Sequence, residues 1–237
     1  MGQLNNVRDG RKAKAFLATF GTTELTSVTL GKIYNVTAKA TSDSAFAALE
    51  IGDFFVATGT TAPTLATGDK CVEVTPKFLG GATDKSLNFE KSTVDVTCDK
   101  DNANNIVSDG VVVSSGNVNC YDLLQSGETA ANRIRQRFNK TVTYAAGAAV
   151  VGELDRTEKD VLIFVWDARD LETGEYIGID FVPAFISSIG HDSAYGSGQT
   201  FNANFSGADS DEFGHRRSYH QFAYQSEFGE QLKSWCA

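Results

Sequence analysis

The residues of this chain with the greatest capacity for chemistry are its three histidines and its carboxylates. His215 and His220 are five positions apart, which would place them on opposite faces of a strand, and His191 is remote from both. That spacing does not favour a metal site. The sequence also contains no GxSxG, no HExxH, no P-loop with its lysine and no GxGxxG between a strand and a helix. We therefore predict no catalytic residue, no metal site and no cofactor, and a protein that is not an enzyme.

Two acidic stretches are partly similar to calcium-binding loops. In residues 99–110, Ala103 stands where a ligand is needed and Asn104 stands where a glycine would allow the bend. Residues 209–214 lack the distal glutamate of such a loop. We interpret both stretches as acidic turns that face solvent.

The cysteines give no sign of a disulfide framework or a zinc site. No CxxC spacing occurs among the four of them, which are Cys71, Cys98, Cys120 and Cys236. Most lie in apolar or strand-like surroundings, where a cysteine behaves as a small hydrophobic residue. We predict buried thiols in a reducing compartment.

The composition is that of an ordinary globular protein with an acidic surplus. Hydrophobic residues make up 41% and charged residues 22% of the chain. Lys and Arg number 21 and Asp and Glu number 30, so the formal net charge is 21 − 30 = −9. Proteins that hold nucleic acid by neutralising phosphates need a basic face. We therefore expect no tight DNA binding, and an acidic surface beside DNA would leave the polymer free to slide.

The apolar runs of the chain are short. The segment Ala15 to Phe20 is too short for the apolar part of a leader peptide, although basic residues precede it. No run approaches the roughly 20 residues that cross a bilayer. We expect a soluble protein that is made in the cytoplasm and has no membrane partner.

The most informative stretch for the fold runs from Thr83 to Asn102. Leu87 and Phe89 fall on odd positions and Val94 and Val96 on even ones, so the apolar side of the chain changes phase between residues 90 and 93. Such a change predicts a tight turn or a bulge between two strands. The turn-forming residues 99–105 then end the strand.

This stretch resembles the centre of the major tail tube protein of long-tailed bacteriophages. In that family a Lys-Ser-Leu/Met strand leads into V-D-V-T and a charged Lys-Asp/Asn turn, followed by a valine-rich strand and a helix. The matching residues are Lys85 to Leu87, Val94 to Thr97, Lys100 to Asn102, Gly110 to Val113 and Ser114 to Cys120. The order of elements matches from Pro76 to Gln221.

The resemblance implies a structural subunit with a mainly β, sandwich-like or barrel-like fold and one packed helix. In the family, hexameric rings stack into a tube, and the sheets of adjacent subunits join around the lumen through which viral DNA is ejected. The implied partners are further copies of the chain and the tape measure, terminator and distal tail proteins, with DNA passing through without tight binding. The implied location is the tail of a virion.

The resemblance divides the chain into three parts. Residues 1–30 would form an N-terminal arm that packs on another subunit, with an ordinary edge hairpin as an equal alternative. Residues 31–75 would form a small β insertion or decoration, and residues 76–237 the tail-tube domain. Alternation and turn residues predict strands along all three parts. They are Ala15 to Phe20, Leu25 to Leu30, Lys32 to Ala38, Asp53 to Ala57, Cys71 to Thr75, Val161 to Trp166, Tyr176 to Val182, Gln199 to Ser206 and Tyr219 to Phe228.

Three further features complete the expected fold. Val111 to Ser114 and Asn117 to Cys120 are separated by Ser-Gly, which predicts a hairpin. Val161 to Trp166 is continuously apolar, which predicts a central strand covered on both faces. The strand that follows is expected to end at Pro183, with residues 185–197 forming a loop.

One helix is predicted near residues 122–139. Asp122 and Gln125 have capping-box spacing, and apolar residues recur at helical intervals after them. Arg133, Arg135 and Arg137 gather toward its C-terminal end. They could complement the helix dipole, or they could form a salt-bridging edge for an acidic neighbouring subunit.

Three aspartates are candidates for charge that faces the lumen or a subunit interface. They are Asp95, Asp99 and Asp101, chosen by their place in the resembled motif. For Asp95 a structural role, accepting backbone hydrogen bonds in a turn, is an equal alternative.

A second interpretation is a carbohydrate-binding or adhesin-like β domain of a virion surface or tail tip. It would require exposed aromatic side chains gathered in a groove. The available residues are Tyr195, Phe213, Tyr219, Phe222 and Tyr224. A glycoside hydrolase is a third and more distant interpretation, since it would need two carboxylates facing each other across a cleft.

Overall fold

The computed structural model describes residues 13–58, 61–79, 82–95, 106–121, 130–140, 142–145, 147–152, 160–170, 174–193 and 198–221. Their strands are β1 (Lys14–Phe20), β2 (Ile33–Ala38), β3 (Phe54–Val56), β4 (Lys70–Phe78), β5 (Ala82–Asp95), β6 (Ile106–Tyr121), β7 (Val142–Ala145), β8 (Ala148–Val151), β9 (Asp160–Asp170), β10 (Gly174–Asp192), β11 (Thr200–Gly207) and β12 (Ser218–Gln221). The helix is α1 (Ala130–Gln136). The predicted mainly β fold with one packed helix is confirmed.

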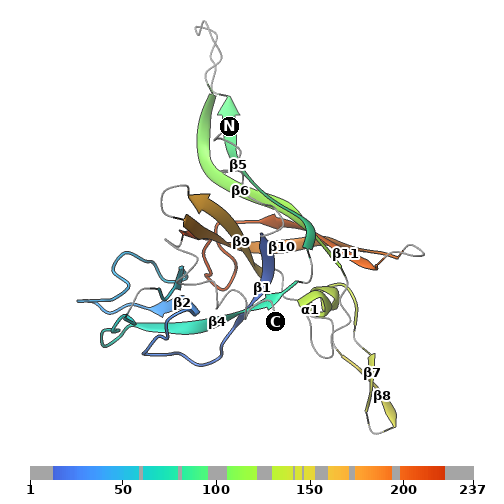
Figure 1. Cartoon of the computed structure of the whole chain (residues 1–237), viewed down its shortest axis with the longest axis horizontal. Coiled ribbons are helices and arrows are strands. Elements are labelled where there is room, and N and C mark those ends of the chain that lie inside the picture. The colour runs from blue at the N-terminus through green and yellow to red at the C-terminus, as the bar shows by residue number, and fades with distance from the viewer. Residues whose placement is uncertain are drawn as a thin grey trace, which may run out of the picture.

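Most of the strands belong to one curled, antiparallel sheet. Its order is β3-β2-β4-β1-β9-β10-β11-β6-β5, and β12 also pairs with β10. Strands β7 and β8 form a separate two-stranded sheet. Figure 1 shows two projections from the body, the long β5–β6 hairpin and the small β7–β8 hairpin. Among the described strands, the long sheet therefore ends in the short β3 on one side and the long β5 on the other.

The centre of the sheet is buried on both faces, as the apolar run from Val161 to Trp166 predicted. This run lies in β9, which pairs with β1 on one side and β10 on the other. Leu162 and Phe164 point into one hydrophobic core, while Ile163 and Val165 point into a second core on the opposite face. Alternate side chains of a strand face opposite ways, so a strand between two cores must be apolar throughout.

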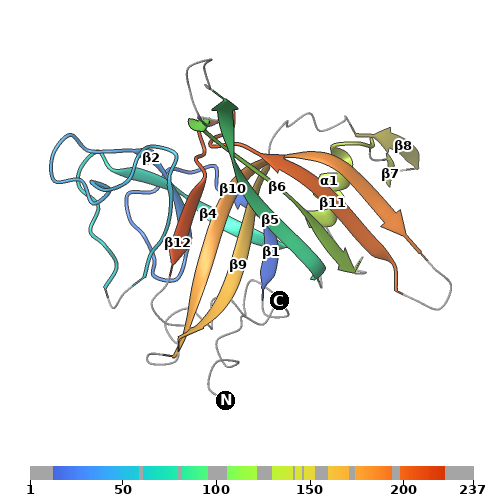
Figure 2. The same cartoon turned by 90° about the horizontal axis from the view of Figure 1, so that it is seen from above.

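Helix α1 covers the first of these cores. Its buried Ile134 packs in the same cluster as Leu162 and Phe164 of β9 and Phe201 and Phe205 of β11. Figure 2 shows the helix lying against the side of the sheet that contains β6 and β11. The predicted helix start, residues 122–129, lies outside the described residues.

The N-terminal strands form a third core of their own. Tyr34, Val36, Phe46, Phe55 and Cys71 are buried together there. Strands β2, β3 and β4 match the predicted strands of residues 31–75, and β4 pairs with β1, which continues the sheet into the rest of the chain. The predicted strand from Leu25 to Leu30 is wrong. Only a single bridge forms there, between Leu25 and Cys71, and the residues after it form bends and a turn, although Val28 is buried in this third core.

The predicted hairpin around Ser115 and Gly116 is also wrong. Both residues lie inside the continuous strand β6, where Gly116 is paired with Leu87 of β5. A Cβ atom at position 116 would lie 2.0 Å from the backbone oxygen of Ser86. The glycine therefore permits a close approach of two strands and does not make a turn.

Strand β10 continues through Pro183 to Asp192, so the predicted loop at residues 185–197 is wrong over its described part. Strand β12 pairs with Gly178–Phe181 and β11 pairs with Ala184–Asp192. Pro183 lies in the gap between these two partners. A residue without a backbone N–H is tolerated there, because no partner on that side requires it.

The phase change predicted between residues 90 and 93 is confirmed as a bulge. The register of β5 against β6 shifts between Lys91 and Thr93, while both strands continue on either side. The extra residues lie in β6, where residues 109–111 oppose the single Ser92 of β5, and the hairpin continues beyond them.

Cys71 and Cys120 are buried free thiols. Cys98 and Cys236 lie outside the described residues. None of the helical segments that the structure describes has the length and hydropathy needed to cross a membrane.

Candidate functional site

Arg137, at the end of the helix, forms a nearly buried ion pair with Asp160 at the start of β9. Its Nη2 lies 2.7 Å from Oδ1 of Asp160, and its Nε donates to Oδ2 at 3.1 Å. The side chains of Arg137 and Asp160 are only 8% and 9% exposed. A two-point contact of this kind fixes both distance and orientation, so the pair joins the helix to the central strand.

The other two arginines predicted as a basic cluster also contact their own chain. Arg133 donates a hydrogen bond from Nη1 to Oγ1 of Thr19 on β1, at 2.9 Å. Arg135 contacts the imidazole of His191 on β10, and its guanidinium lies 5.6 Å from the centre of the Phe201 ring. The three arginines therefore contact four different strands of the sheet, β1, β9, β10 and β11.

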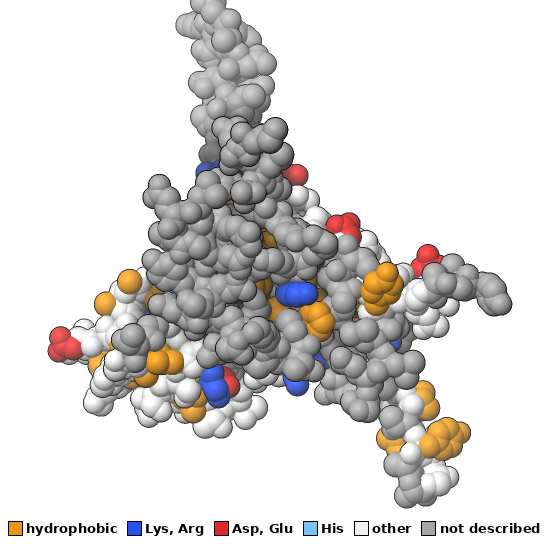
Figure 3. Space-filling model, in the orientation of Figure 1, with side chains coloured by type: hydrophobic (Ala, Val, Ile, Leu, Met, Phe, Trp, Pro, Cys, Tyr) orange, Lys and Arg blue, Asp and Glu red, His pale blue; other side chains and the backbone are white. Residues whose placement is uncertain are grey.

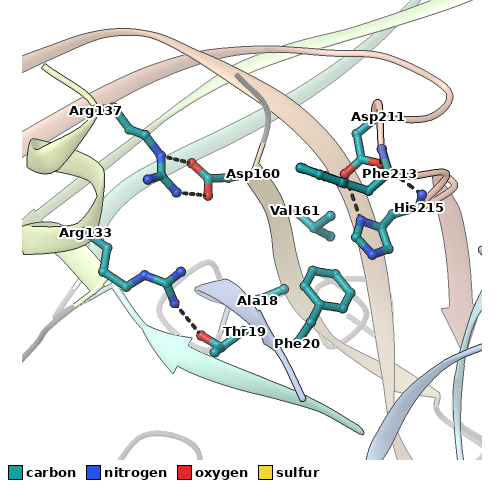
Figure 4. A pocket seen from close by; sticks show the side chains of 10 residues that line it. All are labelled: Ala18, Thr19, Phe20, Arg133, Arg137, Asp160, Val161, Asp211, Phe213 and His215. Atoms are coloured by element: carbon teal, nitrogen blue, oxygen red, sulfur yellow. Dashed lines mark hydrogen bonds and ion pairs between the residues drawn. The ribbon is translucent and has the colours of Figure 1, made fainter. Parts of the chain in front are cut away.

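Arg133 and Arg137 line a cavity of about 230 Å³ between the helix, β1, β9 and the loop before β12. Figure 4 shows both arginines entering from the helical side and Asp211 and His215 closing the opposite side. The imidazole of His215 stacks on Phe20, with ring centres 3.9 Å apart.

The Asp211–His215 pair organises its own loop. The side chain of Asp211 is 1% exposed, and its Oδ2 lies 2.8 Å from Nδ1 of His215. Its Oδ1 accepts hydrogen bonds from the backbone N–H groups of Phe213 and His215, at 3.0 and 2.9 Å. The predicted interpretation of residues 209–214 as a solvated acidic turn is wrong for Asp211, because this carboxylate is turned inward to hold the loop.

The polar groups that line this cavity stabilise the packing of the helix and of the loop before β12 on the sheet. Its polar contacts run from the helix to β1 and β9, or within the loop before β12. Among the residues that the structure describes, no three histidine, cysteine or acidic side chains are grouped to hold a metal ion. His191 and His220 lie on different strands, and desolvation lowers the pKa of His220.

Of the three candidate aspartates, the structure describes Asp95 alone. Asp95 is the last residue of β5 and pairs with Ile106, the first residue of β6. Asp99 and Asp101 lie outside the described residues. The hairpin itself projects from the body of the molecule (Figure 1).

A polar face that the sequence analysis missed lies nearer the base of this hairpin. Strands β5, β6, β11 and β10 are neighbours there and align their residues in transverse rows. One row contains Ser86, Asn117, Asn204 and Ser188. The alternation of Ser and Asn within β6 and β11 was visible in the sequence, but which strands become neighbours was not.

Exposed apolar residues mark two other places. The β7–β8 hairpin exposes Val142, Tyr144, Val150 and Val151, and Figure 3 shows hydrophobic side chains along this projection. Of the aromatic residues considered for carbohydrate binding, Phe213 and Tyr219 are 66% and 54% exposed. Tyr195, Phe222 and Tyr224 lie outside the described residues.

No protein-family model matches the chain, and no curated protein matches it. Two solved structures are similar to part of it. One is a chain of the "Virion of native gene transfer agent (GTA) particle", with 15% identity over 61% of this chain and 88% of its own, and a TM-score of 0.39. The other is a chain of the "Tail of empty GTA particle computed with helical refinement, C6 symmetry", with 14% identity over 61% of this chain and 86% of its own, and a TM-score of 0.37. TM-scores this low do not establish a shared fold.

Proposed function

We propose that this protein is a structural subunit of a phage-type tail tube, a conduit and not a catalyst. The observation that supports this most directly is the position of β5. This strand contains the Lys85 to Leu87 and Val94–Asp95 parts of the resembled motif, and among the described strands it forms an open edge of the sheet. A 14-residue edge strand presents unpaired backbone groups that another chain can cover.

The two ends of the sheet are unlike, which favours head-to-tail assembly. One end is the three-residue β3 and the other is β5. Contacts between unlike surfaces generate a ring when the rotation closes. We propose hexameric rings that stack into a tube, by the resemblance, with further copies of the chain as the main partner. Tape measure, terminator and distal tail proteins would meet the tube along its lumen and at its ends, and the tube would belong to the virion.

The parts of the chain take different roles in this proposal. Residues 76–237 would build the tube wall and residues 31–75 would decorate it. Strand β1, from the predicted N-terminal arm of residues 1–30, pairs with β4 and β9 of its own chain and would therefore belong to the wall. Asp95, Asp99 and Asp101 would place charge on the lumen or at a subunit interface. Arg133, Arg135 and Arg137 would lie on the helix-covered side of the sheet, where they contact their own chain. A ring of six would have a formal charge of 6 × (−9) = −54, which opposes tight DNA binding.

Negative-stain electron microscopy of the purified protein at rising concentration tests this proposal. Stacked rings or hollow tubes are the expected result. Particles that stay monodisperse, even with tail-initiating proteins added, would contradict it.

A carbohydrate-binding domain is the second candidate, favoured by the exposure of Phe213 and Tyr219. Exposed aromatic rings provide the stacking surfaces that sugars use. A glycan screen separates the two candidates: binding that is lost in the Phe213→Ala and Tyr219→Ala variants, in a protein that never polymerises, would favour this second function.

A further inference from the structure

We propose that the surface along which DNA passes is the neutral polar face of β5, β6, β11 and β10, an inference that rests on the proposed tail-tube function. In this arrangement the lumen would be lined mainly by amide and hydroxyl side chains and not by carboxylates. Figure 2 shows these four strands side by side.

Three consecutive rows cross the four strands on this face. From β5 to β10 they read Asp84, Asn119, Asn202 and Gly190; then Ser86, Asn117, Asn204 and Ser188; then Asn88, Ser115, Ser206 and Phe185. All of these residues are exposed or half-buried. On the opposite face of the same strands, Val118, Ala203, Phe205 and Ile186 belong to the first core.

The charge of this face is unusual for an exposed sheet. Asp84 is the only ionised side chain within the three rows. The charged residues that follow on the same face, Glu90 on β5 and Asp192 on β10, are also carboxylates. Solvated strands normally include lysine, particularly near an edge, but the three rows contain no lysine or arginine. A phosphate backbone would therefore find no cation to bind here.

The amide donors of this face are also partly occupied. Asn204 donates from Nδ2 to Oγ of Ser188 at 2.8 Å, and Asn202 donates from Nδ2 to Oδ1 of Asn119. Asparagine and serine side chains often bind phosphate oxygens through their donors. Donors that already bond across the strands bind a passing phosphate less strongly, so the face remains wettable without holding DNA.

The same face is a poor core for a protein interface. Interface cores are depleted of charge but rich in aromatic and other apolar side chains, and only Phe185 is apolar among the three rows. A surface without cations and with one apolar side chain in three rows fits a polyanion in transit better than a bound partner.

Cysteine accessibility in assembled tubes tests this placement. The full chain with Asn204→Cys, co-assembled with excess unmodified chain, is treated with a small maleimide and with a maleimide attached to a protein too large to enter the tube. We expect labelling by the small reagent alone in tubes and by both reagents in unassembled chain. Unmodified chain treated in parallel gives the background of the native thiols, and Ser206→Cys is the second variant.

The outcomes separate this inference from the proposed function. If the unmodified chain forms no tubes, the proposed function fails and this inference fails with it. If tubes form and position 204 reacts with the large reagent, the face lies outside and only this inference is overturned. Tubes in which neither reagent labels position 204 would place the face in a subunit contact and overturn it equally.

A charge variant supplies the second test. Asn204→Lys places a cation on the face, and Asn204→Gln is the matched neutral control. Tubes of the lysine variant should retain short duplex DNA at about 50 mM salt, and the amount retained should be at least about tenfold lower at 200 mM. Lysine–phosphate contacts release counterions, so added salt weakens the binding. Tubes of the glutamine variant and of the unmodified chain should retain little at either concentration. Equal retention by all three would overturn the inference.

Discussion

The Arg137 guanidinium donates two hydrogen bonds to the Asp160 carboxylate, at 2.7 and 3.1 Å, from a position where both side chains are largely excluded from water. This pair joins the helix to β9, whose residues Val161 to Val165 are buried. Removal of either partner leaves an unpaired charge in a poorly solvated place.

Arg137→Met should therefore destabilise the unassembled chain by about 3–5 kcal/mol. Urea unfolding followed by circular dichroism measures the loss. Asp160→Leu should cost a similar amount, whereas the double variant should lose clearly less than the sum of the two, because no unpaired charge remains. Strictly additive losses would show that the pair contributes nothing beyond its separate residues.

Asp69 is expected to make stability depend on pH in the acidic range. Burial acts to raise the pKa of this carboxyl, but hydrogen bonds from the N–H groups of Ala40, Ala45 and Ala66 and from the hydroxyl of Ser44 lower it to about 2. A pKa that is lower in the folded than in the unfolded chain stabilises the fold above the ordinary carboxyl pKa. That stabilisation is lost as the pH falls from about 4 toward 2.

Asp69→Asn should accordingly be less stable than the native chain at pH 7, with the difference shrinking below about pH 4. Thermal unfolding at a series of pH values measures this. The matched control is Asp43→Asn, an exposed aspartate at positive φ, where asparagine is well tolerated. A difference between Asp69→Asn and the native chain that is constant from pH 7 to pH 3 would contradict the assignment.

Gly116→Ala should weaken the long hairpin. The added Cβ would meet the Ser86 backbone oxygen at 2.0 Å, so β5 and β6 must separate. We expect a loss of about 1–3 kcal/mol in thermal or urea unfolding. Gly190→Ala is the control, because its Cβ would lie at an ordinary 3.9 Å from Asn202. Equal behaviour of the two variants would mean that β5 does not approach β6 as closely as described.

Reversal of Asp99 and Asp101 to lysine tests the candidate charges of the tail-tube proposal. Particles assembled with this variant should release DNA more slowly at low salt than at high salt, because screening weakens the new attraction. The measurement is the rate of DNA release at two ionic strengths. Unchanged release at both would show that these two residues do not face DNA.

The sequence determined those features that depend on neighbouring residues alone. Alternation placed strands close to β1, β2, β3 and β11. The phase change before Val94 marked the position of a register shift, but β5 is continuous there and the extra residues lie in β6. The unbroken apolar run in β9 predicted a strand covered on both faces. These features follow from the period of two that side chains keep along a strand, which is a local property.

Only the tertiary structure decided which strands meet, and with them the candidate surfaces. From the sequence, Gly116 was predicted to be a turn residue. In the structure it lies in a strand, directly against the backbone of Ser86, thirty residues earlier. The arginines after residue 130 were visible as a cluster, but Asp160 and Thr19 as their partners were not. Pairing between distant strands depends on the whole set of side chains that must be buried together, so no local pattern predicts it.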